Sequence, residues 1–153
     1  GDSLELSLNV DLRKTSEFGI KVRCSPNGRE ETVILYDVAK GVLKIDTTKS
    51  SLSKDIFQPF PYPQAAYFPK AVRRSKDVRV QEAPFRLRTG ENLKLRIFLD
   101  RSILEVFAND RQCVTQRIYP ARADSKHIKL FCKGDSAAVK SLRAWDMARA
   151  NAY

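Results

Sequence analysis

Residues 93–120 constrain the fold more than any other part of the chain. Their sequence, LKLRIFLDRSILEVFANDRQCVTQRIYP, alternates apolar and polar side chains over 93–100, 103–108 and 113–119. Alternation with a period of two is typical of β-strands that bury one face. Short polar segments with turn character separate the three runs. We therefore expect three consecutive antiparallel strands joined by tight turns.

The same pattern predicts how the first two of these strands pair. A tight turn at Arg101 and Ser102 makes one face of the hairpin wholly apolar. The expected pairs on that face are Leu99 with Leu104, Ile97 with Val106, and Leu95 with Ala108. The other face is mixed, and it carries Lys94, Arg96, Phe98, Asp100, Ile103, Glu105 and Phe107. A slip of one residue would turn the charged side chains into the core, so this register is strongly specified.

Strand-like patterns recur along the rest of the chain. The cleanest is 4–12, where leucines and a valine alternate with polar residues. The other segments with strand character are 18–24, 32–38, 42–47, 85–88, 128–132 and 138–147, with a short edge strand near 78–81. Nine or ten short strands separated by turn signals, without an amphipathic helix, predict an all-β sandwich or barrel.

A proline-rich segment interrupts this pattern between residues 48 and 84. Its five prolines remove backbone donors from any strand ladder, so we expect a long loop at about 57–84 inside one domain that spans residues 1–153. Long loops in compact domains often carry function. Its aromatic residues either contact a sugar or a neighbouring domain, or pin the loop onto its own domain, which we favour. The residues in question are Phe60, Tyr62, Tyr67 and Phe68.

The charge balance is basic, with 28 Lys and Arg against 18 Asp and Glu and a net charge of +10. Such a balance can indicate nucleic acid as a partner. Here the excess is spread over nearly every expected strand, and no basic signature with base-stacking aromatics is present. We therefore expect no nucleic-acid partner. No run of 18 apolar residues exists, so no membrane span is expected either.

The cysteine and histidine content argues against a metal site. Cys24, Cys113 and Cys132 are far apart in sequence, and His127 is the only histidine. We interpret the three cysteines as small buried hydrophobes, and unpaired thiols favour a reducing compartment. Residues 1–10 lack the basic start and apolar block of a signal peptide. With no glycine-rich phosphate loop either, no cofactor is expected.

Asp100 and Glu105 are the one pair of carboxylates whose spacing could indicate catalysis. They are diagonal neighbours on the mixed face of the expected hairpin, and glycoside hydrolysis uses two such groups. However, Lys94, Arg96 and Arg101 lie around them. Ion pairing with these cations would hold both carboxylates ionised, which suits a structural role better than that of a proton donor.

Residues 95–109, LRIFLDRSILEVFAN, resemble the C-terminal β-sandwich module of glycoside hydrolase family 32, which holds invertases, levanases and inulinases. Segments 17–23, 36–43 and 141–147 are similar to other strands of that module. The resemblance implies a two-layer antiparallel β-sandwich of the concanavalin A-like or jelly-roll type. It also implies that the signature residues of the hairpin form a structural motif, namely Asp100, Arg101, Ser102, Glu105 and Phe107.

The resemblance further implies a bimodular enzyme whose N-terminal five-bladed β-propeller carries the catalytic acids. None of the propeller's acidic motifs occurs here, so no catalytic residue is assigned and the chain alone is expected to be inactive on sucrose, inulin or levan. The implied role is a non-catalytic accessory domain that stabilises the propeller, shapes its cleft, and in some cases oligomerises or holds sugar. Two alternatives stay open: a free-standing, lectin-like carbohydrate-binding module, and a basic domain for polyanions.

Overall fold

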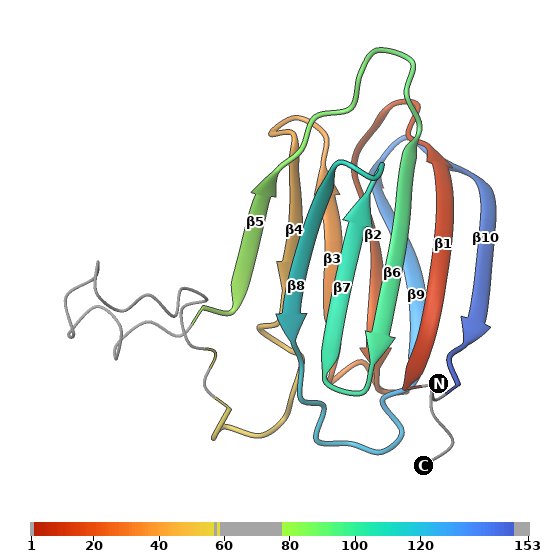
Figure 1. Ribbon diagram of the computed structural model, residues 1–153. Coiled ribbons are helices and arrows are strands. Elements are labelled where there is room, and N and C mark those ends of the chain that lie inside the picture. The colour runs from red at the N-terminus through yellow and green to blue at the C-terminus, as the bar shows by residue number, and fades with distance from the viewer. Residues whose placement is uncertain (1, 57, 59–77, 149–153) are drawn as a thin grey trace.

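The computed structural model describes residues 2–56, 58 and 78–148, and it is an antiparallel sandwich of two five-stranded β-sheets (Figure 1). Sheet A has the strand order β10-β1-β6-β7-β8, and sheet B has the order β5-β4-β3-β2-β9. The strands are β1 (Ser3–Asp11), β2 (Thr15–Cys24), β3 (Thr32–Asp37), β4 (Val42–Asp46), β5 (Val80–Pro84), β6 (Leu93–Asp100), β7 (Ile103–Ala108), β8 (Gln112–Arg117), β9 (His127–Gly134) and β10 (Ala138–Asp146). The two-layer antiparallel sandwich that the family resemblance implies is thus confirmed. The described residues form no helix, and hence none long and apolar enough to cross a lipid bilayer.

The core lies between the sheets and is built by alternate residues of each strand. In sheet A, Leu6 of β1 pairs with Ile97 of β6, and Leu8 pairs with Leu95, all at most 2% exposed. Sheet B meets them with residues such as Ile20, which is fully buried. Full burial of one such side chain contributes about 1.5–3 kcal/mol. The period-two pattern therefore decides which face of each sheet becomes the core.

The register predicted for the hairpin β6–β7 is confirmed pair by pair. The three observed apolar pairs are Leu99 with Leu104, Ile97 with Val106, and Leu95 with Ala108. The two-residue loop between the strands places Arg101 at a φ of 51°, and the Arg101 N–H donates to the carbonyl of Asp2 at 2.7 Å. The register and the position of the turn could be predicted because the alternation and the turn residues that indicate them are local in sequence.

The strand predicted at 85–88 is wrong. The edge strand of sheet B is β5, which pairs with β4 and ends at Pro84. After it, Phe85 is buried against Tyr36, with ring centroids 5.6 Å apart, and the Leu87 N–H donates to the Tyr36 hydroxyl at 3.3 Å. The apolar residues at 85 and 87 therefore anchor an irregular segment to the core, and they do not mark a strand face.

The interpretation of all three cysteines as buried hydrophobes is also wrong. Cys24 is fully buried, but Cys113 and Cys132 are exposed. Cys113 pairs with Phe107 on the outer face of sheet A, and Cys132 lies on the edge strand β9. Cys113 is exposed because strand alternation puts it on the outer face, opposite Phe107. Cys132 points inward, opposite the buried Phe18, and is exposed because β9 is an edge strand, which sequence periodicity does not show.

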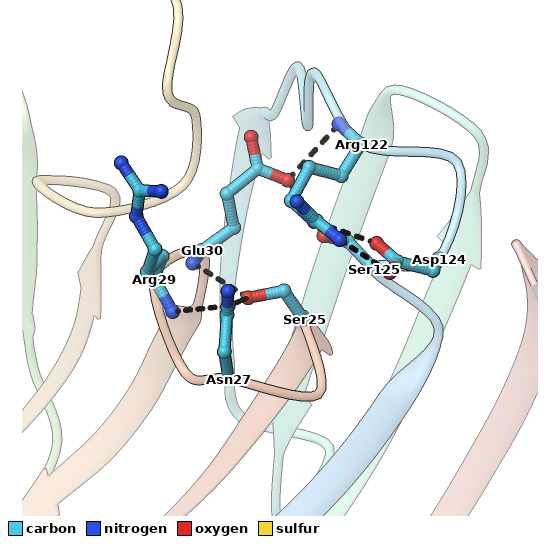
Figure 2. Close-up of polar contacts among 7 residues, drawn as sticks. All are labelled: Ser25, Asn27, Arg29, Glu30, Arg122, Asp124 and Ser125. Carbon is cyan, nitrogen blue, oxygen red and sulfur yellow. Dashed lines mark hydrogen bonds and ion pairs between the residues drawn. The ribbon is translucent and has the colours of Figure 1, made fainter.

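One end of the sandwich is held by a buried carboxylate, that of Glu30, which is 0% exposed (Figure 2). Its Oε1 accepts the N–H groups of Leu52 and Ala121, each at 2.8 Å. Its Oε2 accepts the N–H of Arg122 at 3.1 Å and the hydroxyl of Ser125 at 2.6 Å. Four donors from two loops distant in sequence therefore converge on one side chain.

The backbone around Glu30 is fixed by a second set of local contacts, which Figure 2 also draws. The Glu30 N–H donates to the Ser25 hydroxyl at 2.9 Å, and that hydroxyl donates to Asn27 Oδ1 at 2.8 Å. On the other loop, Arg122 binds the Asp124 carboxylate with two nitrogens, at 2.7 and 2.6 Å. The turn at 25–28 and the connection at 120–125 are thereby joined through Glu30.

We expect Glu30→Gln to lower the free energy of unfolding by about 2–4 kcal/mol, because hydrogen bonds to a charged group contribute about 1.5–3 kcal/mol each. The amide also places a donor where the four surrounding groups are themselves donors. Urea unfolding followed by circular dichroism measures the change. Glu82→Gln on the edge strand β5, where Lys44 lies 3.7 Å away, is the matched control and should change stability by less than about 0.5 kcal/mol. A loss of under about 1 kcal/mol for the Glu30 variant would contradict this account.

The contribution of Glu30 should also depend on pH. Burial by itself would raise the pKa of the Glu30 carboxyl, but hydrogen bonds from Ser125 and from three backbone N–H groups outweigh it and lower the pKa below 4.5. A group with a lowered pKa in the folded state stabilises the fold above its unfolded pKa, and the effect is lost as the pH falls through the folded pKa. The stability difference between the native chain and Glu30→Gln should therefore be full near pH 7 and narrow below about pH 4.5. Urea unfolding repeated across this range tests the dependence, and a difference that grew on acidification would contradict it.

Candidate functional site

A hollow of about 850 Å³ opens on the outer face of sheet A, over β10, β1, β6 and β7 and the turn that follows β7. We call it the sheet-A hollow. Its outward-facing lining consists of Glu5, Ser7, Asn9, Lys94, Arg96, Phe107, Asn109, Asp110, Ser141, Arg143 and Trp145. It covers part of the mixed face that the sequence predicted for the hairpin, namely Lys94, Arg96 and Phe107, and extends across two further strands.

The strand register arranges these residues in rows, because directly paired residues of antiparallel strands share a face. The first row runs across the sheet as Trp145, Glu5 and Phe98. The second is Arg143, Ser7, Arg96 and Phe107, and the third is Ser141, Asn9 and Lys94. Three separate stretches of sequence thus contribute to one surface.

The floor of the hollow is held by contacts around Arg96. Its Nε donates to Glu5 Oε1 at 2.7 Å, and its guanidinium lies over the Phe98 ring, 5.0 Å from the centroid. Phe98 in turn packs edge-to-face on Phe107, at 5.9 Å and 89°. Aromatic pairs of this geometry contribute about 0.5–1.5 kcal/mol beyond their burial. The centre of the hollow is therefore preorganised.

Other lining groups are left available for a ligand or a partner. Lys94 and Arg143 both line the hollow, and neither has an ion pair among the described residues. Trp145, on the edge strand β10, is 46% exposed. Cations and an exposed indole suit a polar, hydroxyl-rich surface better than an apolar one.

The rim of the hollow is organised by Asn109, which has a φ of 48°. Its Oδ1 accepts the Lys94 N–H at 2.8 Å, and its Nδ2 donates to Glu91 Oε1 at 2.9 Å. Hydrogen bonds from the Arg88 backbone and from Asn109 lower the pKa of the Glu91 carboxyl, and Arg111 adds to the effect at 2.5 Å. Asparagine is among the residues that adopt positive φ most readily, so this position both turns the chain and caps β6.

The signature residues of the hairpin contact mainly the neighbouring strands β1 and β8 and the segments next to them. Asp100 accepts the Ser3 hydroxyl at 2.9 Å, the Ser102 carbonyl accepts the Ile118 N–H at 2.9 Å, and Glu105 lies 3.5 Å from the Thr115 hydroxyl. Arg101 occupies the turn described above, and Phe107 is the one signature residue that lines the hollow.

The ion pairs that we expected between these carboxylates and Lys94, Arg96 or Arg101 do not form in the described part of the chain, so that expectation is wrong. Arg96 binds Glu5 instead, because β1 pairs along the free side of β6 and brings its own carboxylate closer.

The four aromatic residues proposed as sugar or domain contacts lie outside the described residues; they are Phe60, Tyr62, Tyr67 and Phe68. Sequence reasoning missed Asn9, Arg143 and Trp145 as members of a site. Their outward position follows from strand periodicity, but their proximity to the hairpin depends on β10 and β1 pairing in sheet A. Among the described residues, no group of three His, Cys, Asp or Glu side chains could hold a metal ion.

Comparison with known proteins agrees with this architecture. The family model described as "Glycosyl hydrolases family 32 C terminal" matches residues 1–146. A levanase from Bacillus subtilis is 34% identical over 145 residues, which cover 93% of this chain and 18% of the levanase. An insoluble β-fructofuranosidase isoenzyme from rice is 29% identical, over 90% of this chain and 23% of the relative. The chain thus spans about a fifth of the length of these curated relatives.

Solved structures show the same fold. An exo-inulinase from Aspergillus awamori superposes with a TM-score of 0.67 at 27% identity, over 94% of this chain and 24% of that one. A carbohydrate-binding module from Bacillus subtilis superposes with a TM-score of 0.56 at 7% identity, over 94% of this chain and 75% of the module, which shows a shared fold alone. With the family model matched almost end to end, the chain belongs to the C-terminal domain family of the family 32 glycosyl hydrolases.

Proposed function

We propose that this chain is the non-catalytic C-terminal accessory domain of an enzyme that acts on β-fructosides such as sucrose, inulin or levan. In this role it packs beside an N-terminal β-propeller catalytic domain, stabilises it and shapes the edge of its cleft. The observation that carries the proposal is the family match over residues 1–146, combined with the fact that the chain spans 18% and 23% of a levanase and a β-fructofuranosidase. Most of each relative therefore lies outside the matched region.

The carboxylates of the sheet-A hollow support a non-catalytic role. The two that line it are Glu5 and Asp110. Glu5 accepts the Nε–H of Arg96 at 2.7 Å, and Asp110 follows Asn109 in the turn at the rim of the hollow. Glu5 is thus engaged in holding the floor of the hollow, which suits a structural role.

The first test is activity. We expect the purified 153-residue chain to release no reducing sugar from sucrose, inulin or levan above a buffer blank. The parent enzyme, meaning the full-length protein in which this domain follows the catalytic domain, should release reducing sugar. Deleting this domain from the parent should lower the melting temperature of the remaining catalytic domain, because an apolar interface becomes exposed to water. Sugar release by the isolated chain, or an unchanged melting temperature after deletion, would contradict the proposal.

A second candidate function, sugar holding, is favoured by the sheet-A hollow. Its exposed Trp145, in the row next to that of Arg143 and Ser7, offers a flat apolar surface next to hydrogen-bonding groups, which matches the alternating faces of a sugar ring. The fold shared with a carbohydrate-binding module adds support at the level of architecture. In this reading the domain would hold fructan chains near the catalytic cleft.

Calorimetric titration of the chain with fructan oligosaccharides tests this second candidate. We expect Trp145→Ala to lower the affinity at least about tenfold, because one lost stacking contact of about 1.4 kcal/mol has that effect. Tyr119→Ala, which removes an aromatic ring that is 37% exposed outside the hollow, is the matched control and should bind as the native chain does. The absence of heat with the native chain would leave the packing role as the only supported one.

A further inference from the structure

The two strands at one side of the sandwich, β9 and β10, leave core-facing apolar residues exposed. Leu130 is 38% exposed although its partner Ile20 is fully buried, and Leu142 is 46% exposed although its partner Leu8 is 2% exposed. Val139 is 42% exposed in the same way. Of the seven large apolar side chains that are more than a third exposed in the described residues, three therefore face inward at this side. We call this opening the β9–β10 edge.

The opposite side of the sandwich is closed, which makes the contrast informative. There Gln112 Nε2 donates to the Pro84 carbonyl at 2.9 Å, and Gln81 bonds to Gln116, so that β5 and β8 are joined. No such bond joins β9 to β10 among the described residues; β9 pairs with β2 and β10 with β1. In Figure 1, β10 lies farther to the side than β9, and no labelled strand of sheet B follows β9 there. Natural proteins rarely leave an apolar sheet edge uncovered.

The charges around this edge indicate what kind of segment would cover it. Residues 126–148 contain five Lys and Arg but two Asp, a difference of +3. Lys129 on β9 forms no ion pair in the described part of the chain. Lys133 pairs with Glu17 and Lys140 with Asp11, each at 3.5 Å and at exposed positions, where an ion pair contributes little. Directly opposed unlike charges stabilise neighbouring strands, whereas like charges destabilise them. A second copy of this chain, with its net charge of +10, is therefore a poor occupant.

We propose that the β9–β10 edge binds an extended acidic segment of the adjoining catalytic domain, which adds a strand to β9 beneath β10. Alternate apolar residues of this segment would cover Leu130 and Leu142, and its acidic residues would lie opposite Lys129 and Lys133. Strand addition to a free edge supplies backbone hydrogen bonds, and pockets for alternate side chains supply specificity. The inference rests on the proposed accessory function and specifies the surface through which the two domains join.

The three cysteines allow a direct test by thiol labelling under native conditions. Cys132 lies on β9 beside Leu130 and is exposed, Cys113 is exposed on β8, and Cys24 is buried. Burial also raises the pKa of the Cys24 thiol, which keeps it unreactive. Variants Cys113→Ser and Cys132→Ser report each exposed thiol separately. We expect both to react in the 153-residue chain, and Cys132 to react at least about tenfold more slowly in the parent enzyme, which corresponds to an opening cost of about 1.4 kcal/mol.

A charge placed in the edge should reverse this protection. In the parent enzyme, Leu142→Lys should return Cys132 to the labelling rate of the isolated chain, while the isolated variant stays folded because that side chain is already 46% exposed. Ile103→Lys, at a β7 position that is 40% exposed on the outer face of sheet A, is the matched control and should leave Cys132 protected. Circular dichroism of both isolated variants confirms that they fold.

The alternative outcomes separate this inference from the function on which it rests. Protection of Cys113 without Cys132 would show that the domains join through sheet A, which overturns the inference and leaves the accessory function standing. Protection of neither thiol in the parent enzyme would overturn the inference, and the melting temperature after deletion of the domain would then decide whether the accessory function stands. If protection of Cys132 in the isolated chain rises with the concentration of that chain, the occupant is a second copy. This outcome would overturn the inference and leave the accessory function standing.

Discussion

Burial of the alternating apolar residues of β1 and β6 against sheet B is the interaction on which the rest of the structure depends. Leu6 and Leu8 pair with Ile97 and Leu95 at the centre of sheet A. Because strand side chains alternate between faces, placing these residues in the core places their neighbours on the outer face. Glu5, among those neighbours, then binds Arg96 in the floor of the sheet-A hollow. The position of the hollow is therefore a consequence of core packing.

What could be predicted from the sequence follows the separation of the interacting residues along the chain. The β6–β7 hairpin was predictable to the residue because its turn and its alternation are both local. The Glu5–Arg96 pair was not, because it joins residues 91 positions apart and depends on which strand lies next to β6. The same reasoning explains Glu30, whose partner Ser125 is 95 positions away and which no alternation or motif distinguishes from a surface acid.

The exposure of side chains on the edge strands of the two sheets was the other property that sequence periodicity could not predict. The pattern of β10 correctly predicts a strand, and Leu142 correctly falls on the inward face opposite Leu8. However, a side chain that points inward is not buried where the facing sheet ends, and β10 is exposed along most of its length. Cys132 was assigned to the core for the same reason. Strand order, which sets the edges, is a property of the whole sheet and is not encoded in any one segment.

The carboxyl groups of this domain with a shifted pKa are held by hydrogen-bond donors. Among the described residues, every carboxyl with a shifted pKa is shifted downward by the donors around it, as for Glu30, Asp37, Glu91 and Asp124. A general acid near neutral pH requires the opposite shift, which comes from burial without compensating donors. Glu30 is the instructive case, because it is fully buried and yet four donors saturate its oxygens. Burial alone would raise the pKa of the Glu30 carboxyl, as a general acid requires, but the four donors lower it instead. Glu30 therefore serves to hold two loops together.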